Sequence, residues 1–325
     1  MTGPPPATAA LRVAVRRALA DLPATAPVAA AVSGGADSLA LAAALAFERP
    51  GSLAFTVDHA LQAGSAAVAG QAAQVCRELG LTAQVLAGPA PAGAQGPEGR
   101  ARTLRYGLLE VAARDAGVVA VLLGHTLDDQ AETVLLGLAR GAGARSLSGM
   151  APLRGLWRRP LLGIRRAQTE QACAEAGLQP WQDPHNTDPV YARVRVRTEV
   201  LPGLELALGP GVAEALARTA ELLREDADAL DALTTPTGEV AVLASLPGAV
   251  RARSLKAWAE QGCGRSVSAA QVGALRALVE EWHGQGAVAL PGGVSALRIG
   301  GWLSLVAGAP SGATNLAPRD LADTA

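Results

Sequence analysis

The strongest signal in the chain is the run Val28-Ala29-Ala30-Ala31-Val32-Ser33-Gly34-Gly35-Ala36-Asp37-Ser38. The small apolar residues at its start are typical of a buried strand, and the alanine- and leucine-rich segment from Leu39 to Phe47 is typical of a helix. The glycine turn Ser33-Gly34-Gly35 separates the two. Such a turn aims free backbone N–H groups and a helix N-terminus at one point, which favours the binding of a phosphate.

The residues of this turn predict a nucleotide site. Gly34 and Gly35 can adopt positive φ and allow a ligand close to the backbone, and two serine hydroxyls lie near the helix start. Asp37 would repel phosphates unless a divalent cation lay between them, so we interpret it as an anchor for Mg²⁺. The predicted cofactor-binding residues of the turn are Ser33, Gly34, Gly35, Ala36, Asp37 and Ser38, with Asp37 as the predicted metal ligand.

Other glycine loops fit less well. An ordinary strand-to-helix turn also contains S-G-G. A Walker-type P-loop needs a lysine after its last glycine, and the single lysine of this chain is Lys256. A dinucleotide fingerprint needs a third glycine at a fixed spacing, which is missing. The remaining pattern, S-G-G-x-D-S, resembles the pyrophosphate loop of the PP-loop ATP pyrophosphatases, which split ATP between its α and β phosphates.

Composition restricts the possible function classes. The 325 residues suggest about two domains, and the net charge of −1 excludes a chain-wide basic surface for nucleic acid. The three cysteines show no C-x-x-C spacing, so neither a disulfide framework nor a cysteine-rich cluster is predicted. No signal peptide and no bilayer-spanning apolar run is evident, so we expect a cytoplasmic protein without a membrane partner.

Strands alternate with helices in the first part of the chain. Besides 28–32, strands are predicted over residues 53–57, 82–86 and 118–124. Helices are predicted over residues 11–22 and 65–80, after a disordered lead over 1–8. This order predicts an α/β fold with a doubly wound, mostly parallel sheet, which binds ligands at the carboxyl ends of its strands. Asp58 and His59 follow the second strand, so Asp58 joins the predicted cofactor-binding residues; the alternative is that they only begin a loop.

Two charged segments supply the predicted catalytic residues. Glu98, Arg102 and Arg105 share one face of a predicted helix, either as a solvated face or as two cations that meet a polyanion. His125, Asp128, Asp129 and Glu132 follow the fourth strand and fall on one side of a helix. Such groups are costly above a buried strand unless they face a ligand, a metal or water; acidic residues that cap a helix are the alternative. We predict catalytic roles for Asp37, Arg102, Arg105, His125, Asp128, Asp129 and Glu132.

Residues 137–197 form a basic zone with ten arginines and four acidic residues, a local charge of +6. Three interleaved aromatic residues, at 157, 181 and 191, would suit a phosphodiester backbone with stackable bases, whereas the alternative is a solvated basic surface. Arg193, Arg195 and Arg197 would share a face in a strand and fan around a helix. The predicted RNA-binding residues are Arg140, Arg159, Arg193, Arg195 and Arg197.

The C-terminal part predicts a separate module. A long helix over 212–233 has leucines at sevenfold spacing and six acidic residues against two arginines, which is typical of a connector. Helices follow over 250–260 and from a capping box at Ser268 and Gln271 to Trp282. Three short strands between 288 and 306 then complete a small α+β module. The tail over 309–325 is predicted to be disordered.

The motifs together resemble the bacterial tRNA(Ile)-lysidine synthetases, a branch of the PP-loop superfamily. The match covers residues 28–202 and includes Asp58-His59-Ala60-Leu61, Glu98 to Tyr106, Gly124 to Thr133, Arg159-Pro160-Leu161-Leu162 and 183–201. Val194 stands where the family often has Asn. The resemblance implies a PP-loop domain over 1–210, a linker helix over 211–235, a small tRNA- and substrate-binding domain over 236–308 and the tail.

The resemblance also implies a reaction. ATP would adenylate the C2 oxygen of a wobble cytidine in the tRNA(Ile) with a CAU anticodon, and the amine of free L-lysine would displace AMP. ATP, Mg²⁺, this tRNA and lysine are therefore the expected partners; the sequence leaves a homodimer open. Lysine has a solution pKa of about 10.4, so a carboxylate or His125 is expected as base. The two alternatives are a tRNA thiolase, which would want cysteines, and a regulatory nucleotide-binding module without turnover.

Overall fold

The computed structural model describes residues 3–58, 64–89, 97–183 and 187–308; the predictions on His59 and on the tail lie outside these ranges. The chain divides into two compact units, Met1–Arg224 and Glu225–Ala325. The division falls inside the long helix α10 (Val212–Ala232), which matches the predicted helix over 212–233. The domain boundaries expected at 210 and 235 stay a prediction.

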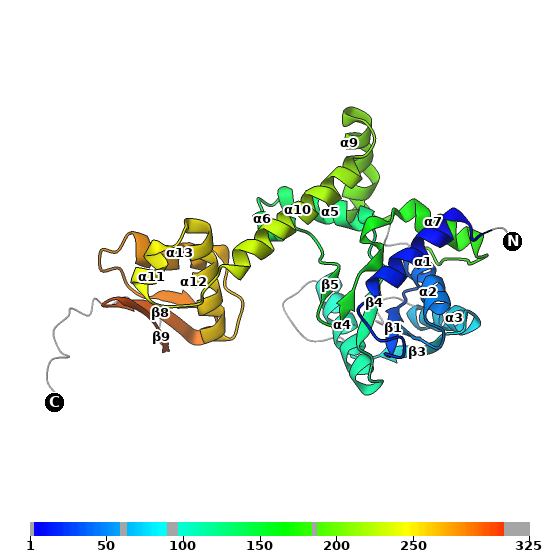
Figure 1. Ribbon diagram of the computed structural model, residues 1–325, viewed down its shortest axis with the longest axis horizontal. Helices are drawn as coiled ribbons and strands as arrows, with labels where there is room; N and C mark the ends of the chain where they lie inside the picture. The colour runs from blue at the N-terminus through cyan, green and yellow to red at the C-terminus, as the bar shows by residue number, and fades with distance from the viewer. Residues whose placement is uncertain (1–2, 59–63, 90–96, 184–186, 309–325) are drawn as a thin grey trace. The chain divides into compact units, whose positions relative to one another are not determined.

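The first unit contains a six-stranded sheet. Figure 1 shows this sheet with helices packed around it. Its strands are β1 (Val28–Ala31), β2 (Leu53–Asp58), β3 (Thr82–Ala87), β4 (Ala120–Leu123), β5 (Leu153–Arg154) and β6 (Trp157–Arg158). The order is β3-β2-β1-β4-β6-β5, and every pair is parallel except β5 with β6. The predicted doubly wound, mostly parallel sheet is therefore confirmed. Because β1 has β2 on one side and β4 on the other, the crevice above these central strands is the expected ligand site.

Helices cover both faces of this sheet. The longer ones are α1 (Pro6–Ala18), α2 (Ala36–Glu48), α3 (Ser65–Glu78), α4 (Pro97–Asp115), α5 (Leu127–Leu138) and α7 (Arg166–Glu175). Shorter turns are α6 (Ala144–Leu147), the 3₁₀ helix η1 (Pro160–Gly163), α8 (Ala192–Arg195), the π-helical turn η3 (Val196–Val200) and α9 (Leu201–Leu208). Residues of β1 alternate between two cores: Val28 and Ala30 pack with α1 and α2, whereas Ala29 packs with α4. The result is a three-layer α/β/α arrangement.

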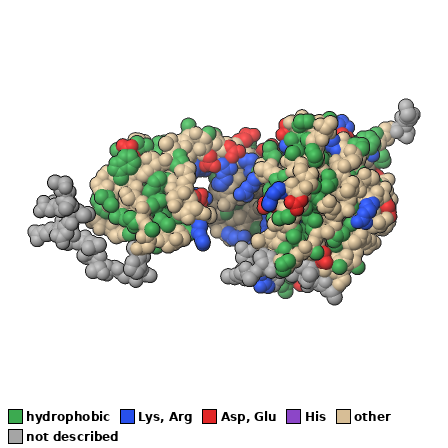
Figure 2. All heavy atoms as spheres, turned by 90° about the horizontal axis from the view of Figure 1, so that it is seen from below, with side chains coloured by type: hydrophobic (Ala, Val, Ile, Leu, Met, Phe, Trp, Pro, Cys, Tyr) green, Lys and Arg blue, Asp and Glu red, His purple; other side chains and the backbone are tan. Residues whose placement is uncertain are grey.

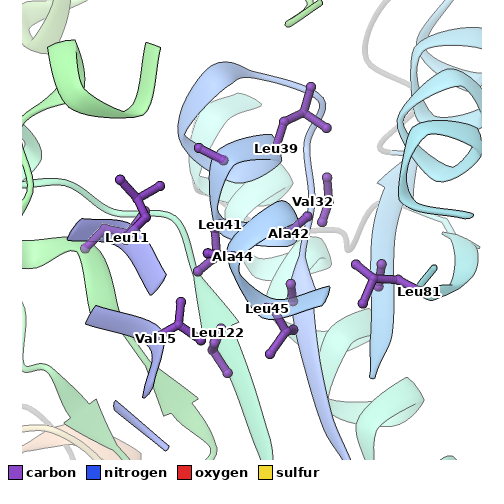
Figure 3. Close-up of a cluster of buried hydrophobic side chains, with 14 of the residues drawn as sticks. Leu11, Val15, Val32, Leu39, Leu41, Ala42, Ala44, Leu45, Leu81 and Leu122 are labelled. Carbon is purple, nitrogen blue, oxygen red and sulfur yellow. The ribbon is translucent and has the colours of Figure 1, made fainter. Parts of the chain in front are cut away.

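The larger core lies between the sheet and the helices α1, α2, α3 and α7. Figure 3 shows Leu11 and Val15 of α1 near Leu41 and Leu45 of α2, with Leu122 of β4 beneath them. All five side chains are at most 1% exposed. Burial of a leucine or valine stabilises a fold by about 1.5–3 kcal/mol, so this face fixes α2, and with it the glycine turn, on the sheet.

The predicted disordered lead is wrong for Pro6 to Thr8, which form the first turn of α1. Proline suits this position because the first helical N–H groups need no partner within the helix. Thr8 donates to Glu175 of α7 through its backbone N–H at 2.9 Å and its hydroxyl at 2.6 Å. That partner is 167 residues away, so a reading of the local sequence could not find it. The helix also ends earlier than predicted, at Ala18.

The second unit is a small α+β module. Its helices are α11 (Val240–Ser245), α12 (Gly248–Cys263) and α13 (Ala269–Glu280), and its antiparallel strands are β7 (Val288–Leu290), β8 (Val294–Ile299) and β9 (Trp302–Ala307), with the 3₁₀ turn η4 (Pro291–Gly293) between β7 and β8. Ala296 and Leu303 on one face of this sheet pack against the helices. The capping box of Ser268 with Gln271 and the three-stranded meander are confirmed.

Within the described ranges, no single helix is long and apolar enough to cross a membrane. One bent pair, Ala192–Leu208 with Val212–Ala232 at 99°, meets the criterion by length and composition only.

Candidate active site at the centre of the sheet

A pocket of about 870 Å³ opens where β1 and β4 end. It is bounded by the glycine turn, the start of α2, and residues of α4, α5 and α7. The sequence-predicted residues that line it are Ser33, Gly35, Ala36, Asp37, Ser38, Arg105, His125, Asp129 and Arg197. The tertiary structure thus brings the predicted nucleotide-binding turn and several of the predicted catalytic residues to one cavity.

The glycine turn is held by its own hydrogen bonds. The Ser38 hydroxyl accepts from the backbone N–H of Ser33 at 3.1 Å and donates to the carbonyl of Gly35 at 2.9 Å. Gly34 adopts φ +89°, which glycine favours, whereas Gly35 has an ordinary φ of −73°. Gly35 caps α2 without a side-chain hydrogen bond, so no side chain covers the first N–H groups of this helix. That arrangement suits an anionic ligand.

The end of β4 lies close against this turn. A Cβ built on Gly124 would be 3.1 Å from the carbonyl carbon and oxygen of Asp37 and 3.2 Å from Cα of Ser38. Any side chain at Gly124 would therefore push the backbone of α2 away from β4. The glycine explains how the helix carrying Asp37 can begin beside the loop carrying His125.

Asp37 is three-quarters buried at the start of α2. Its Oδ1 accepts a hydrogen bond from the hydroxyl of Thr169, and its Oδ2 lies 3.5 Å from Nε of Arg166. Burial raises the pKa of this carboxyl, and the hydrogen bond from Thr169 and the charge of Arg166 partly oppose the rise. A desolvated carboxylate of this kind gains from a nearby cation.

The residues present fit Mg²⁺ in one limited way. Among the described residues, no group of three or more His, Cys, Asp or Glu side chains could hold a metal ion. In nucleotide sites Mg²⁺ is commonly held by one or two carboxylates together with the phosphates. Asp37 beside the turn that is predicted to bind phosphates matches that pattern, so its carboxylate would hold the metal.

The four charged residues predicted after β4 do not share one environment. Asp128 accepts a hydrogen bond from Nε of Arg165 at 3.1 Å and another from the backbone N–H of Arg166 at 2.7 Å, so it caps the start of α7. Asp129 forms a capping box with Thr126, the N-cap of α5. The alternative of acidic helix capping thus holds for Asp128 and Asp129, although Asp129 also lines the pocket.

Glu132 is completely buried and lies among three arginines. Its carboxylate is 2.9 Å from Nε of Arg193, 2.7 Å from Nε of Arg197 and 3.4 Å from Nη1 of Arg166. Arg193 also donates to the hydroxyl of Thr133 at 2.8 Å. A buried carboxylate needs such partners, because its desolvation would otherwise exceed any gain.

Asp129 lines the pocket and also contacts two of these three arginines. Burial opposes its ionisation, yet attraction to Arg166, the backbone hydrogen bond from Thr126 and attraction to Arg193 outweigh it, so its pKa lies below the ordinary value. Its Oδ1 is 3.0 Å from Nη2 of Arg166 and 3.6 Å from Nη2 of Arg197. Asp129 therefore stays ionised.

His125 lies between the acidic and basic groups, and its Nδ1 is buried without a hydrogen-bond partner among the described residues. Burial lowers its pKa to about 4, and the charges of Arg159, Arg102 and Arg193 act in the same direction against Asp129. The imidazole is neutral at pH 7. It can accept a hydrogen bond from a ligand, but it is a weak base.

Of the other predicted catalytic and cofactor residues, Arg105 lines the pocket, whereas Arg102 and Asp58 do not. Arg102 and Arg105 are exposed on α4, and the guanidinium of Arg102 lies 5.0 Å from the ring centre of Tyr106. Asp58 accepts a hydrogen bond from the hydroxyl of Ser65 at 2.6 Å, at the start of α3. Their roles toward a ligand stay predictions.

The predicted RNA-binding arginines fall into two groups. Arg193 and Arg197 lie one turn apart in α8 and η3 and both face Glu132, so the helical alternative is the correct one. Arg159 is buried and donates to the carbonyl of Ala151 at 2.9 Å. Arg140 and Arg195 are exposed. On the face drawn in Figure 2, several basic side chains gather in one patch, with acidic side chains beside them.

The sequence analysis missed the polar residues of the α7 region that pair with the predicted site residues: Arg165, Arg166 and Thr169. The two arginines entered only as part of the basic zone, and Thr169, which is fully buried, carried no signal. Their partners lie on α2, α5 and α10, between 34 and 132 residues away. Only the packing of α7 against the sheet reveals them.

Comparisons with known proteins agree with these motifs. Residues 10–204 match the family model described as PP-loop domain, and residues 239–303 match the one described as TilS substrate binding domain. A curated tRNA(Ile)-lysidine synthase from Thermobifida fusca is 52% identical over 308 residues, covering 90% of this chain and 95% of the relative. The chain belongs to the tRNA(Ile)-lysidine synthase family.

Other relatives extend this result. The tRNA(Ile)-lysidine synthase from Salinispora tropica is 50% identical over 322 residues, covering 93% of this chain and 97% of the relative. The family resemblance drawn from the motifs is thus confirmed. Among solved structures, the U34-tRNA thiolase NcsA from Methanococcus maripaludis, with its 4Fe-4S cluster, has a TM-score of 0.57 and 20% identity. It covers 67% of this chain and 80% of its own, which shows a shared fold.

The cysteines of this chain give no support to the thiolase alternative. Cys76 lies in α3, Cys173 in α7 and Cys263 in α12, and all three are free thiols. Burial raises the pKa of Cys76 and of Cys173 to about 11, so neither is a reactive thiolate at pH 7.

Proposed function

We propose that this protein joins free L-lysine to C2 of the wobble cytidine in the tRNA(Ile) with a CAU anticodon, at the expense of ATP. The observation that carries the proposal is the pocket at the centre of the sheet, where the glycine turn and Asp37 meet His125 and Asp129, in a chain about 50% identical to curated tRNA(Ile)-lysidine synthases. A cytoplasmic location is part of this proposal. A homodimer stays a prediction, which light scattering can test.

The reaction is proposed to pass through an adenylated cytidine. The C2 oxygen of cytosine is a poor leaving group, and transfer of the adenylyl group of ATP to this oxygen makes it the leaving oxygen of AMP. In this step the C2 oxygen bonds to the α-phosphorus, and pyrophosphate leaves with the electron pair of the broken P–O bond. The backbone N–H groups at the start of α2 would hold the phosphates, and Asp37 would hold Mg²⁺, which neutralises them.

In the second step the lysine amine attacks C2 and AMP leaves. We propose that His125 and Asp129 orient this amine, because both line the pocket and can accept hydrogen bonds from it. Asp128 and Glu132 support them indirectly, since neither of these two residues lines the pocket. The pKa of about 4 makes His125 a weak acceptor for a proton from an amine of pKa about 10.4.

The test is lysine-dependent pyrophosphate release with ATP, Mg²⁺ and an unmodified tRNA(Ile) transcript, followed by mass spectrometry of the nucleosides. Wild type should release pyrophosphate and form lysidine, and Asp37→Asn should abolish both. Arg16→Met, which breaks an exposed ion pair with Glu48 far from the pocket, is the matched control. Near-normal release by Asp37→Asn would refute the role of Asp37. Nucleotide binding without release would favour a regulatory module.

Contacts with the tRNA backbone are proposed for the exposed arginines Arg140 and Arg195. Each phosphate contact that is lost should lower the slope of log affinity against log salt by about 1. Arg140→Ala and Arg195→Ala should therefore flatten the salt dependence of tRNA binding in a filter assay. An unchanged slope in both variants would remove these residues from the RNA surface.

A further inference from the structure

Arg166 connects the two halves of the pocket. It is the first residue of α7, and its side chain is 20% exposed. Its guanidinium reaches Asp129 at 3.0 Å and Glu132 at 3.4 Å on α5, and Asp37 at 3.5 Å on α2. One cation is thus shared by carboxylates of the two helices that follow β1 and β4.

The contacts of Arg166 are unequal in strength. Its backbone N–H donates to Asp128 at 2.7 Å, and its Nη2 donates to Asp129 at 3.0 Å, so both ends of the residue are attached to α5. The contact with Asp37 is longer, at 3.5 Å. If the pair with Asp37 breaks, the guanidinium remains where it is, because α5 holds it.

The two oxygens of Asp37 have different partners. Oδ1 accepts the hydroxyl of Thr169, which is fully buried, whereas Oδ2 faces Nε of Arg166. A divalent cation that binds Asp37 through Oδ2 would therefore meet the guanidinium. Two cations at one oxygen repel each other, so the metal and Arg166 compete for Oδ2.

We propose that Arg166 is a positioning residue that serves as the temporary counter-ion of Asp37: it neutralises Oδ2 while the nucleotide is absent and yields that oxygen to the divalent cation that enters with ATP. The inference rests on the proposed function only in taking Asp37 as the metal anchor. Its consequence is that Mg²⁺ alone binds weakly, because it must break the pair of Asp37 with Arg166 without help from phosphates.

The experiment measures Mg²⁺ binding to the nucleotide-free protein by calorimetric titration, together with thermal melting with and without Mg²⁺. Arg166→Met removes the competing cation and should tighten Mg²⁺ binding about tenfold, the effect expected of one partly exposed charge. Its melting temperature should be lower than wild type in EDTA and should rise more on addition of Mg²⁺. Arg166→Lys keeps a charge near Asp129 without the planar fork and should lie between the two.

Two further variants separate this role from a structural one. Arg165→Met is the matched control, because Arg165 pairs with Asp128 and Glu214, and it should lose stability without a gain in Mg²⁺ affinity. In the double variant Asp37→Asn with Arg166→Met the gain should vanish. The proposal is overturned if neither Arg166 variant binds Mg²⁺ more tightly than wild type, or if the gain survives in the double variant. Failure of lysidine formation would leave these Mg²⁺ measurements unaffected, so the two proposals fail separately.

Discussion

The two halves of the pocket differ in whether their polar groups already have partners within the protein. The half after β1 is made of backbone: Ser33 to Ser38 are braced by hydrogen bonds within the turn, and the first N–H groups of α2 have no side-chain cap. The half after β4 is made of side chains, and its carboxylates are already matched by arginines from α7, α8 and η3. An anion can enter the first half directly. A cationic substrate can enter the second only by displacing an arginine, so conformational change is expected there.

The largest effect is expected from Glu132→Gln. The substitution keeps the shape but leaves the guanidinium groups of Arg166, Arg193 and Arg197 without their buried counter-charge. Breaking a buried pair costs about 3–5 kcal/mol, and partial exposure of the arginines places this case near 3 kcal/mol. Urea denaturation measures the loss.

The control for Glu132→Gln is Asp231→Asn, which breaks the pair of a half-exposed carboxylate with Arg253 and should change stability little. Equal stability of the two variants would show that the side-chain half does not depend on its buried carboxylate.

The next effect concerns pH. Burial first, and then the charges of Arg159, Arg102 and Arg193, lower the pKa of His125 to about 4, against about 6.5 in the unfolded chain. Between these values the unfolded chain binds a proton that the folded protein does not, so stability falls as the pH drops from 6.5 to 4. The loss approaches about 3 kcal/mol. His125→Gln should lose less stability than wild type between pH 7 and 4.5, and an identical loss in both would contradict the assignment.

The smallest effect on stability distinguishes the two glycines of the turn. Gly34→Ala should cost about 1–2 kcal/mol, because its φ of +89° strains an L-residue. Gly35→Ala has an ordinary φ and no atom nearer to the new Cβ than Ser33 Oγ at 3.9 Å, so stability should change by less than about 0.5 kcal/mol.

Gly35→Ala should affect ATP binding more than it affects stability. The Cβ of Gly35→Ala would stand over the first N–H groups of α2, so ATP affinity should fall in a protein that is as stable as wild type. A calorimetric titration with ATP checks this. Unchanged affinity would mean that phosphates do not approach the turn at Gly35.

Much of the fold follows from local patterns. The buried strands with Val28 and Val121, the helix starts at Ser65 and Ala269, and the meander around Gly293 were predictable, because each pattern concerns residues that are close in sequence. The first turn of α1 was not, since its stability depends on the contact of Thr8 with Glu175. The short strands β5 and β6 were not predictable either, because they too depend on partners that are distant in sequence.

The candidate site divides in the same manner. The turn from Ser33 to Ser38 was found whole, whereas the residues from His125 to Glu132 were found without their partners. Helical spacing placed Asp128 and Glu132 on one side of α5, but it could not tell that one would cap α7 and the other would be buried among arginines. The arginines at 193 and 197 were predicted to bind RNA from the charge of their zone and its interleaved aromatic residues, and the structure pairs both with Glu132.

By itself, the sequence determined the glycine turn between a strand and a helix, the first four strands and the family, because backbone geometry and short motifs depend on neighbouring residues. Only the tertiary structure decided which charges meet: Asp37 with Arg166, and Glu132 with three arginines. Ion pairs form between side chains whose positions are set by the packing of α5, α7 and η3. Charge composition, in contrast, says how many partners exist but not where they lie.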